Sequence, residues 1–467
     1  MTTDERTPGR KLAIAILVAA LLAVPLFAVY LIVYDRQSQS DTARAGIAAG
    51  WGGPQIVAGP LLVIPYQDQT TETVVEGGRS VARTRTVWRE LTLAPEVADL
   101  ATAVTPEKRS RSIYEAVLFE ARVTGRTRFA IPADLARYGV TPDRLLFDRA
   151  ELRFGLRDAR GLFGRPPAVS VDGRRLVLQP GKGPAETSGS GFYTLLDAGA
   201  LRTRPIAATF AFAFRGNGWL SLAPLAGDTR WTVTSSWPHP SFQGGFLPTS
   251  HRIADGFAAT WRIGNLALGR ALVTTGDPGG TATVGTPDRF ATAIAPQDGE
   301  ARISLVSPVD LYAQVNRSVK YGFLFIGFTF AAFLMFDLIA GVRVAAAEYL
   351  LVGAGLVLFF VLLLALAEVI GFAAAYVVAS GAIIGLVAAY SAAVLRSWRR
   401  GGFVAALLAG LYGTLYILLS LEAYSLLIGA GLLFAALAAI MYLTRNIDWG
   451  GLRAVPLDPN LSTRTRD

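Results

Sequence analysis

Both histidines of the chain lie in one short segment, residues 237–251, beside serines that could act as nucleophiles. His239 is two residues from Ser241, and an imidazole near a serine hydroxyl can support hydrolysis or contribute to a metal site. The spacing matches no zinc motif, and no Gly-x-Ser-x-Gly sequence surrounds the serines. Because prolines and aromatic residues flank these positions, we predict that Trp237, His239 and Ser241 form a rigid loop. A hydrolase centred on His239 and Ser241 is the alternative.

The remaining composition excludes several kinds of site. The chain has no cysteine, so it has no disulfide, no thiolate metal ligand and no cysteine nucleophile. The glycine-rich stretches 161–164 and 181–191 contain no Walker A lysine pattern and no dinucleotide-binding fingerprint, and we interpret them as turns. We therefore predict that the protein holds no metal and no cofactor.

The chain is basic, with a formal net charge of +9 and a pI of about 9.8. Many of the cations flank apolar segments on one side, and others are scattered through strand-like segments. Nucleic-acid binding requires a clustered basic stripe that follows the phosphates, which this distribution does not show. We therefore expect no nucleic-acid partner.

Several apolar segments are long enough to cross a membrane. The first, Leu12–Tyr34, has no charged residue and is longer than the apolar core of a secretory signal peptide. We predict an uncleaved anchor helix at 12–34. A C-terminal bundle, 321–443, then contains five further spans, at about 321–341, 347–367, 370–391, 402–421 and 424–443.

Arginines between the spans indicate the orientation in the membrane. They are Arg343, Arg396, Arg399 and Arg400, with Arg445 and Arg453 after the last span. If the N-terminal segment 1–11 is cytoplasmic, alternation through six spans leaves all of these residues in the cytoplasm, as the positive-inside rule requires. The tail 444–467 is then cytoplasmic too, and residues 35–320 lie in the periplasm.

The ionisable residues of the bundle lie near the ends of the spans. A pump or transporter usually carries charge near the middle of the bilayer, so this distribution argues against a transporter. Arg317 and Lys320 precede the second span, and Glu368 and Glu422 lie at the outer ends of others. We predict ion pairs between these basic and acidic residues, which would tie the outer domain to the bundle. The alternative is that water solvates each charge separately.

The outer segment has the alternating pattern of half-buried strands. Apolar residues alternate with polar or small residues at 87–93, 116–123, 152–156, 209–214 and 258–263. Gly216-Asn217-Gly218 predicts a hairpin turn, and its likeness to 123–132 suggests an internal repeat. We predict an α + β membrane protein with six transmembrane helices, in which a β-sandwich-like domain is inserted between the anchor and the bundle.

A family resemblance is carried by stretches spread over nearly the whole chain. They are Trp51–Tyr66, Ser112–Glu115, Asp158–Leu162, Trp237–Phe242, Val309–Tyr312, Lys320–Phe325, Glu348–Gly353, Ala365–Phe372 and Met441–Trp449. In this order they resemble the CreD family of bacterial inner-membrane proteins. The candidate functional or structural residues within them are Trp51, Gln55, Pro60, Pro65, Asp158 and Arg160, together with Trp237, His239 and Ser241.

The resemblance implies a factor of cell envelope integrity or envelope stress with no established catalytic activity. Our first hypothesis is a non-enzymatic protein whose periplasmic β domain contacts a partner, a lipid or a wall component. Its expected partners are membrane lipids and an unidentified periplasmic or membrane protein. A transporter or flippase is the second hypothesis, and a periplasmic hydrolase is the third.

Overall fold

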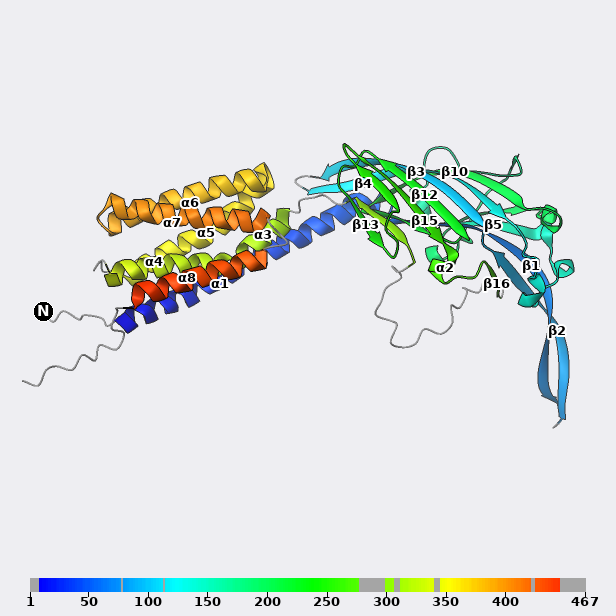
Figure 1. Ribbon diagram of the computed structural model, residues 1–467, viewed down its shortest axis with the longest axis horizontal. Coiled ribbons are helices and arrows are strands. Elements are labelled where there is room, and N and C mark those ends of the chain that lie inside the picture. Colours follow the sequence, from blue (N-terminus) through cyan, green and yellow to red (C-terminus); the bar gives the residue numbers. More distant parts are fainter. Residues whose placement is uncertain are drawn as a thin grey trace, which may run out of the picture. The chain divides into compact units, whose positions relative to one another are not determined.

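The computed structural model describes residues 8–76, 79–111, 114–276, 299–305, 311–339, 345–420 and 425–445. The chain forms two compact units, one of residues 1–41 and 309–467 and the other of residues 42–308. Helices make up the first unit and β-sheets make up most of the second (Figure 1).

The boundaries between the units differ from the expected division at 35 and 320. Helix α1 (Pro8–Ala49) does not end with the apolar run but continues until a segment rich in glycine and proline follows it. Residues expected in the β domain also form helix α3 (Leu311–Lys320), which belongs to the helical unit. Its buried residues Tyr312, Val315 and Val319 recur at helical spacing.

The helical unit contains the predicted membrane spans. Five segments of the described chain are long and apolar enough to cross a membrane: Lys11–Ala49, Leu311–Met335, Ala346–Ile370, Phe372–Val394 and Trp398–Leu419. A further helix of 20 residues without a charge, α8 (Ser425–Thr444), follows them. The other helices are α4 (Gly322–Ile339), α5 (Ala346–Ile370), α6 (Phe372–Val394) and α7 (Trp398–Ser420).

Aromatic side chains fill the interior of the helical unit. The ring of Phe359 on α5 lies 5.5 Å from that of Tyr376 on α6 and 4.5 Å from that of Tyr412 on α7. The hydroxyl of Tyr376 donates to the main-chain carbonyl of Tyr412 at 2.7 Å. A hydrogen bond between buried groups is favourable here because lipid offers neither partner an alternative.

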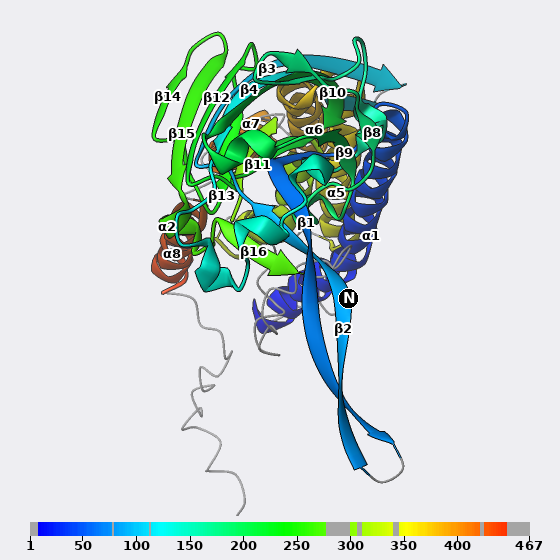
Figure 2. The ribbon, with the colours of Figure 1, turned by 90° about the vertical axis from the view of Figure 1, so that its right-hand side faces the viewer.

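The β domain consists of two sheets. The first has the order β13-β17-β11-β1-β5-β9-β8, with β2 paired to β1 and β16 paired to β2. Its strands are β1 (Gln55–Glu76), β2 (Arg79–Leu93), β5 (Ala150–Leu156), β8 (Gln179–Pro180), β9 (Gly191–Leu196), β11 (Trp219–Ala223), β13 (Pro240–Gly244), β16 (Val273–Gly276) and β17 (Ala301–Leu305). Strands β1 and β2 continue together as a ribbon that projects from the domain (Figure 2).

The second sheet has the order β14-β15-β12-β3-β4-β10-β6-β7. Its strands are β3 (Val97–Arg111), β4 (Tyr114–Phe129), β6 (Ala168–Val171), β7 (Arg174–Arg175), β10 (Ile206–Asn217), β12 (Asp228–Ser235), β14 (Ser250–Ile253) and β15 (Phe257–Gly264). Most neighbours are antiparallel, but β12 runs parallel to β3, and β1 runs parallel to β11 in the first sheet. A short helix, α2 (Asn265–Leu268), follows β15.

Aromatic contacts join the two sheets across the core. Phe154 on β5 meets Phe210 on β10 with ring centroids 5.2 Å apart, and Phe192 on β9 meets Phe212 on β10 at 5.4 Å. Edge-to-face pairs of this kind add to the gain from burying the rings. The two packed sheets, the N-terminal helix and the C-terminal bundle confirm the predicted fold class.

The predicted hairpin at Gly216–Gly218 is wrong. Strand β10 belongs to the second sheet and β11 to the first, so the turn carries the chain from one sheet to the other. A Cβ atom at Gly216 would lie 2.5 Å from the ring of Phe119 and 2.8 Å from Gln55, so close packing requires glycine here. The suggested repeat fails as well, because Gly125 lies within β4 and not in a turn.

Candidate functional site

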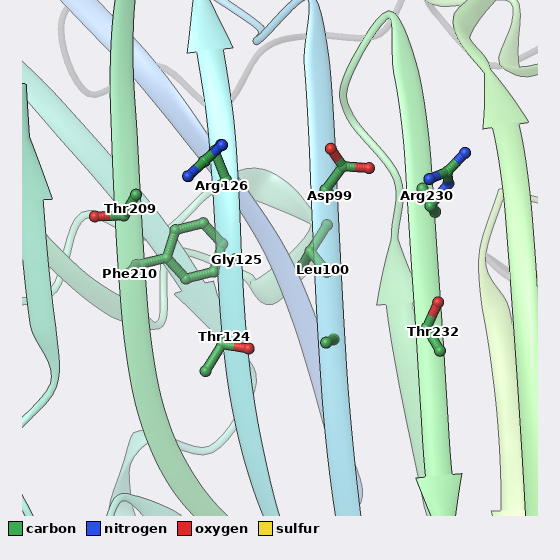
Figure 3. A pocket seen from close by; sticks show the side chains of 10 residues that line it. Asp99, Leu100, Thr124, Gly125, Arg126, Thr209, Phe210, Arg230 and Thr232 are labelled. Carbon is green, nitrogen blue, oxygen red and sulfur yellow. The ribbon is translucent and has the colours of Figure 1, made fainter.

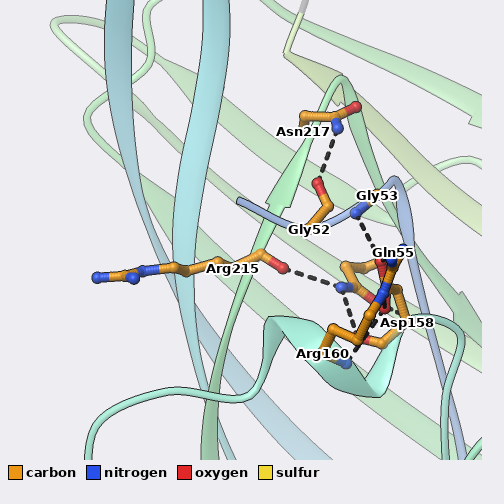
Figure 4. Close-up of polar contacts among 7 residues, drawn as sticks. All are labelled: Gly52, Gly53, Gln55, Asp158, Arg160, Arg215 and Asn217. Atoms are coloured by element: carbon orange, nitrogen blue, oxygen red, sulfur yellow. Dashed lines mark hydrogen bonds and ion pairs between the residues drawn. The ribbon is translucent and has the colours of Figure 1, made fainter. Parts of the chain in front are cut away.

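Gln55 is fully buried at the start of β1, the strand that follows α1 in the chain. Its side-chain oxygen accepts a hydrogen bond from the N–H of Asp158 at 3.1 Å. Its side-chain nitrogen donates to the carbonyl oxygens of Asp158 at 3.1 Å and of Arg215 at 2.9 Å (Figure 4). The buried amide therefore has a partner for its oxygen and for both of its N–H groups.

Asp158 begins the stretch Asp158–Leu162, which this site brings together with the stretch Trp51–Tyr66. Its carboxylate accepts from the N–H of Gly53 at 3.0 Å and from the N–H of Arg160 at 3.1 Å, which caps the short 3-10 helix Ala159–Gly161. The Arg160 guanidinium donates to the same carboxylate at 2.9 Å. The hydrogen bonds from this guanidinium and then from the main chain lower the pKa of Asp158, so the group is ionised at neutral pH.

A second set of contacts holds Trp51, directly before the glycines. Two guanidinium carbons, of Arg109 and Arg215, lie 3.9 and 4.0 Å from the centroid of the Trp51 ring. The indole N–H donates to the carbonyl of Phe119 at 3.3 Å. Arg215 in turn donates to Glu120, which fixes the guanidinium against the ring.

Glycines let the main chain approach closely at this site. A Cβ atom at Gly161 would lie 2.5 Å from the carbonyl oxygen of Arg215 and 2.7 Å from the Gln55 nitrogen. Gly52 has a φ of +127°, which disfavours any side chain, and its carbonyl accepts from the Asn217 side chain at 2.8 Å. We call Gly52, Gly53, Gln55, Asp158, Arg160, Arg215 and Asn217 the Gln55 cluster. It joins β1 and the residues before it to the second sheet by direct hydrogen bonds.

Sequence reasoning identified Trp51, Gln55, Asp158 and Arg160 as candidates but not their arrangement. It missed Arg215 and Asn217, which it placed in or beside a hairpin turn. The glycines on both sides of Asn217 were the signal that could have identified these residues. Glycine indicates a close approach of the main chain to another segment as well as a turn.

The two candidate prolines shape β1. The register between β1 and β5 shifts between Ala58 and Leu61, and Pro60 lies in this irregular part of the strand. Further along, the carbonyl of Pro65 accepts from the N–H of Leu146 at 3.0 Å. Pro60 therefore lies at an irregularity of the strand, whereas Pro65 stays in register with Glu90 of β2.

The histidine-containing segment does not form a nucleophile–base pair. The Trp237 indole is buried and donates to the main-chain carbonyl of His239 at 3.0 Å, while the His239 side chain is exposed. The hydroxyl of Ser241 accepts from Gln243 at 3.1 Å. Among the described residues, no hydrogen bond joins Ser241 to a histidine, and no group of three His, Asp or Glu side chains could hold a metal ion.

In the helical unit, Glu368 lies among different partners from those expected. Its carboxylate is 3.9 Å from the Arg36 guanidinium on α1 and accepts from the hydroxyl of Tyr312 on α3 at 3.2 Å. Lys320 is exposed and makes no ion pair within the described part of the chain, and Glu422 lies outside it. Arg317 also belongs to α3.

Arg36 could have been found from the sequence. It directly follows the first apolar run, and the alternation of spans puts that end of the run on the same side of the membrane as Glu368. The predicted tie between the outer domain and the bundle through Lys320 or Glu422 stays a prediction.

Comparison with known proteins extends over both units. The model of a family described as inner membrane protein CreD matches residues 8–450. The protein named inner membrane protein CreD from Escherichia coli K12 is 31% identical over 438 residues, which cover 92% of this chain and 91% of that relative. The match therefore includes the helical unit as well as the Gln55 cluster.

Proposed function

Because this chain belongs to the CreD family of inner membrane proteins, we propose that it is a non-enzymatic factor of cell envelope integrity. It is a multi-pass inner membrane protein. In this proposal both termini lie in the cytoplasm and the β domain lies in the periplasm. There the domain contacts an envelope component, which is a lipid, a wall component or a protein.

The hydrogen bonding of the Gln55 cluster is the observation that carries this proposal. Residues of two motif stretches, Trp51–Tyr66 and Asp158–Leu162, meet there, yet the Gln55 amide and the Asp158 carboxylate are bound to main-chain atoms and to Arg160. A catalytic group must instead face a space that a substrate can enter. The motif residues thus support a rigid domain whose exposed surface performs the function.

The test is restoration of the envelope barrier in a bacterial strain that lacks its own family member. The strain receives the full chain or a His239→Ala/Ser241→Ala variant, and entry of a dye that an intact envelope excludes is measured under detergent stress. We expect both chains to restore the barrier equally, because neither side chain takes part in a reaction. The amount of each chain in the membrane is measured in parallel.

Two outcomes would contradict the proposal. Loss of restoration by the His239→Ala/Ser241→Ala variant, at an unchanged amount of folded protein, would favour a hydrolase. Failure of the unaltered chain to change dye entry at all would remove the envelope role.

A further inference from the structure

One face of the second sheet carries a row of arginines that crosses the strands. Each residue of this row is in register with the next one on the neighbouring strand. The row consists of Arg175, Ser170, Thr209, Arg126, Asp99, Arg230 and Arg262. Their neighbours along the strands, such as Leu100, Phe210, Trp231 and Trp261, are buried in the core. Since side chains alternate between the faces of a sheet, the row points outward.

The charge of this row is not balanced. It contains four arginines and a single carboxylate, and Arg126, Arg230 and Arg262 make no ion pair within the part of the chain that the structure describes. Some other guanidinium groups of the domain are paired, as Arg128 is with Glu96 at 3.3 Å and Arg153 with Glu90 at 2.8 Å. The unpaired groups are therefore available to an anionic ligand.

The next row on the same face is made of small side chains and forms the floor of a shallow trough. Thr124, Ala101, Thr232 and Thr260 follow one another across four strands. Figure 3 shows Arg126, Asp99 and Arg230 at one level of three neighbouring strands, with Thr124 and Thr232 at the next level. The cavity along these residues has a volume of about 530 Å³.

Beyond the floor, the next row contributes one more arginine. Arg122 is in register with Ala103, which is in register with Thr234. Rows on one face are about 7 Å apart along a strand, and strands are about 4.8 Å apart. Several guanidinium groups thus border the threonine floor on one side, spread over different strands, and Arg122 alone borders it on the other. The ligand that fits is extended and carries several separated anionic groups.

The chemistry of the trough discriminates between classes of ligand. A small molecule is normally enclosed by its pocket, whereas this trough is open to solvent. A protein partner needs large apolar or aromatic anchors. The floor offers alanine and threonine, and the side chains of Leu100 and Phe210, which also line the cavity, are buried. Threonine hydroxyls both donate and accept hydrogen bonds, which suits a ligand rich in hydroxyl groups.

We propose that this trough binds an acidic glycan, an extended hydroxyl-rich polymer with carboxylate or phosphate substituents. The inference rests on the proposed function and deepens it, because it gives the chemical class of the envelope component that the β domain contacts. Arg126 and Arg230 bind the anionic groups, and Thr124 and Thr232 bind the sugar hydroxyls.

The test measures binding of fluorescent polygalacturonate to the purified full chain in detergent micelles, with neutral dextran of the same length as a control. We expect saturable, salt-sensitive binding of polygalacturonate and none of dextran. The Arg126→Ala/Arg230→Ala variant should bind at least tenfold more weakly. The Arg137→Ala/Arg165→Ala variant, which loses the same charge outside the sheets, should bind within twofold of the unaltered chain.

A second variant tests the same site by an increase in affinity for polygalacturonate and keeps every arginine. Asp99→Asn removes the carboxylate of the row and should tighten polygalacturonate binding severalfold. Equal binding by the unaltered chain and by Arg126→Ala/Arg230→Ala would overturn the proposal, as would no tightening in Asp99→Asn. Tighter binding of poly-glutamate than of polygalacturonate would also overturn it and would indicate an acidic protein segment. None of these results depends on the barrier assay, so failure of glycan binding is distinguishable from failure of the envelope role.

Discussion

The side-chain amide of Gln55 and the main chain of Asp158 donate hydrogen bonds to each other, both at 3.1 Å, although the residues are 103 positions apart. These two hydrogen bonds are of the same kind as the pair that two opposite residues exchange in an antiparallel β-ladder, except that a side-chain amide replaces one of the main chains. The second N–H of the same amide donates to the carbonyl of Arg215 in the opposite sheet. One buried side chain thus links both sheets at the point where the chain enters the β domain.

Replacement of Gln55 by alanine should destabilise the β domain by about 2 kcal/mol or more. The change removes the partner of the Asp158 N–H and of the Arg215 carbonyl in a buried site, at about 1–3 kcal/mol each before water can enter, whereas the Asp158 carbonyl still accepts from the N–H of Gly161. The measurement is the unfolding free energy of the full chain in detergent, followed by tryptophan fluorescence. Gln67→Ala, at an exposed position on the same strand, should change it by less than about 0.5 kcal/mol. Equal effects of the two substitutions would contradict the role of Gln55.

Asp158 should make the β domain sensitive to acid. Its folded pKa is lower than its unfolded pKa because Arg160 and main-chain N–H groups bind the ionised form. The unfolded state therefore takes up the proton first, and the stabilisation is complete at neutral pH and is lost as the pH falls below about 4. The thermal midpoint of Asp158→Asn should be lower than that of the unaltered chain at pH 7, and the difference should shrink at pH 3.

The control for this prediction is Asp255→Asn, at an exposed position with no hydrogen bond or ion pair in the described structure. It should follow the unaltered chain at both pH values. A constant difference between Asp158→Asn and the unaltered chain from pH 7 to pH 3 would show that ionisation of Asp158 does not stabilise the domain.

The periodicity of the sequence predicted the elements well because each depends on local chemistry. Uncharged apolar runs of sufficient length become helices in a membrane, and alternating runs become strands with one buried face. The helix at the N-terminus was predicted to end at Tyr34 because the apolar run ends there. It continues to Ala49 because helix formation depends on backbone preference as well, and no proline intervenes before Pro54.

The arrangement of the strands could not be predicted in the same way. The alternating sequence pattern places Arg126 and Arg230 in separate strands, where each alternates with core residues. In the sequence the cations are therefore scattered. Only the registers of β4, β3 and β12 bring them into one row. The partners of Gln55 were missed for a similar reason, since its bonds go to main-chain atoms, which any residue type provides.

Position 125 should require glycine because the aromatic ring of Phe210 covers it. A Cβ atom at this position would lie 2.2 Å from the Phe210 ring in the neighbouring strand. Gly125→Ala should therefore destabilise the domain by about 1–3 kcal/mol through overpacking. In a Phe210→Leu background the same substitution should cost less, which a double-mutant cycle measures directly.

Gly264→Ala is the matched control, because the nearest atom to its Cβ would be 3.8 Å away. It should have little effect in either background. If Gly125→Ala cost as much with leucine at position 210 as with phenylalanine, the ring would not be the reason for glycine.

The orientation of the chain in the membrane can be tested by single cysteines, because the protein has none of its own. A membrane-impermeant maleimide applied to spheroplasts should label Thr234→Cys, on an exposed position of β12, before lysis. Ser397→Cys lies between α6 and α7 beside Arg396, Arg399 and Arg400, and it should be labelled only after lysis. We expect this result because the positive-inside rule places the arginine-rich connection in the cytoplasm, and the alternation of spans then places the β domain outside. The reverse pattern of labelling would place the β domain in the cytoplasm and would remove the basis for its contact with an envelope glycan.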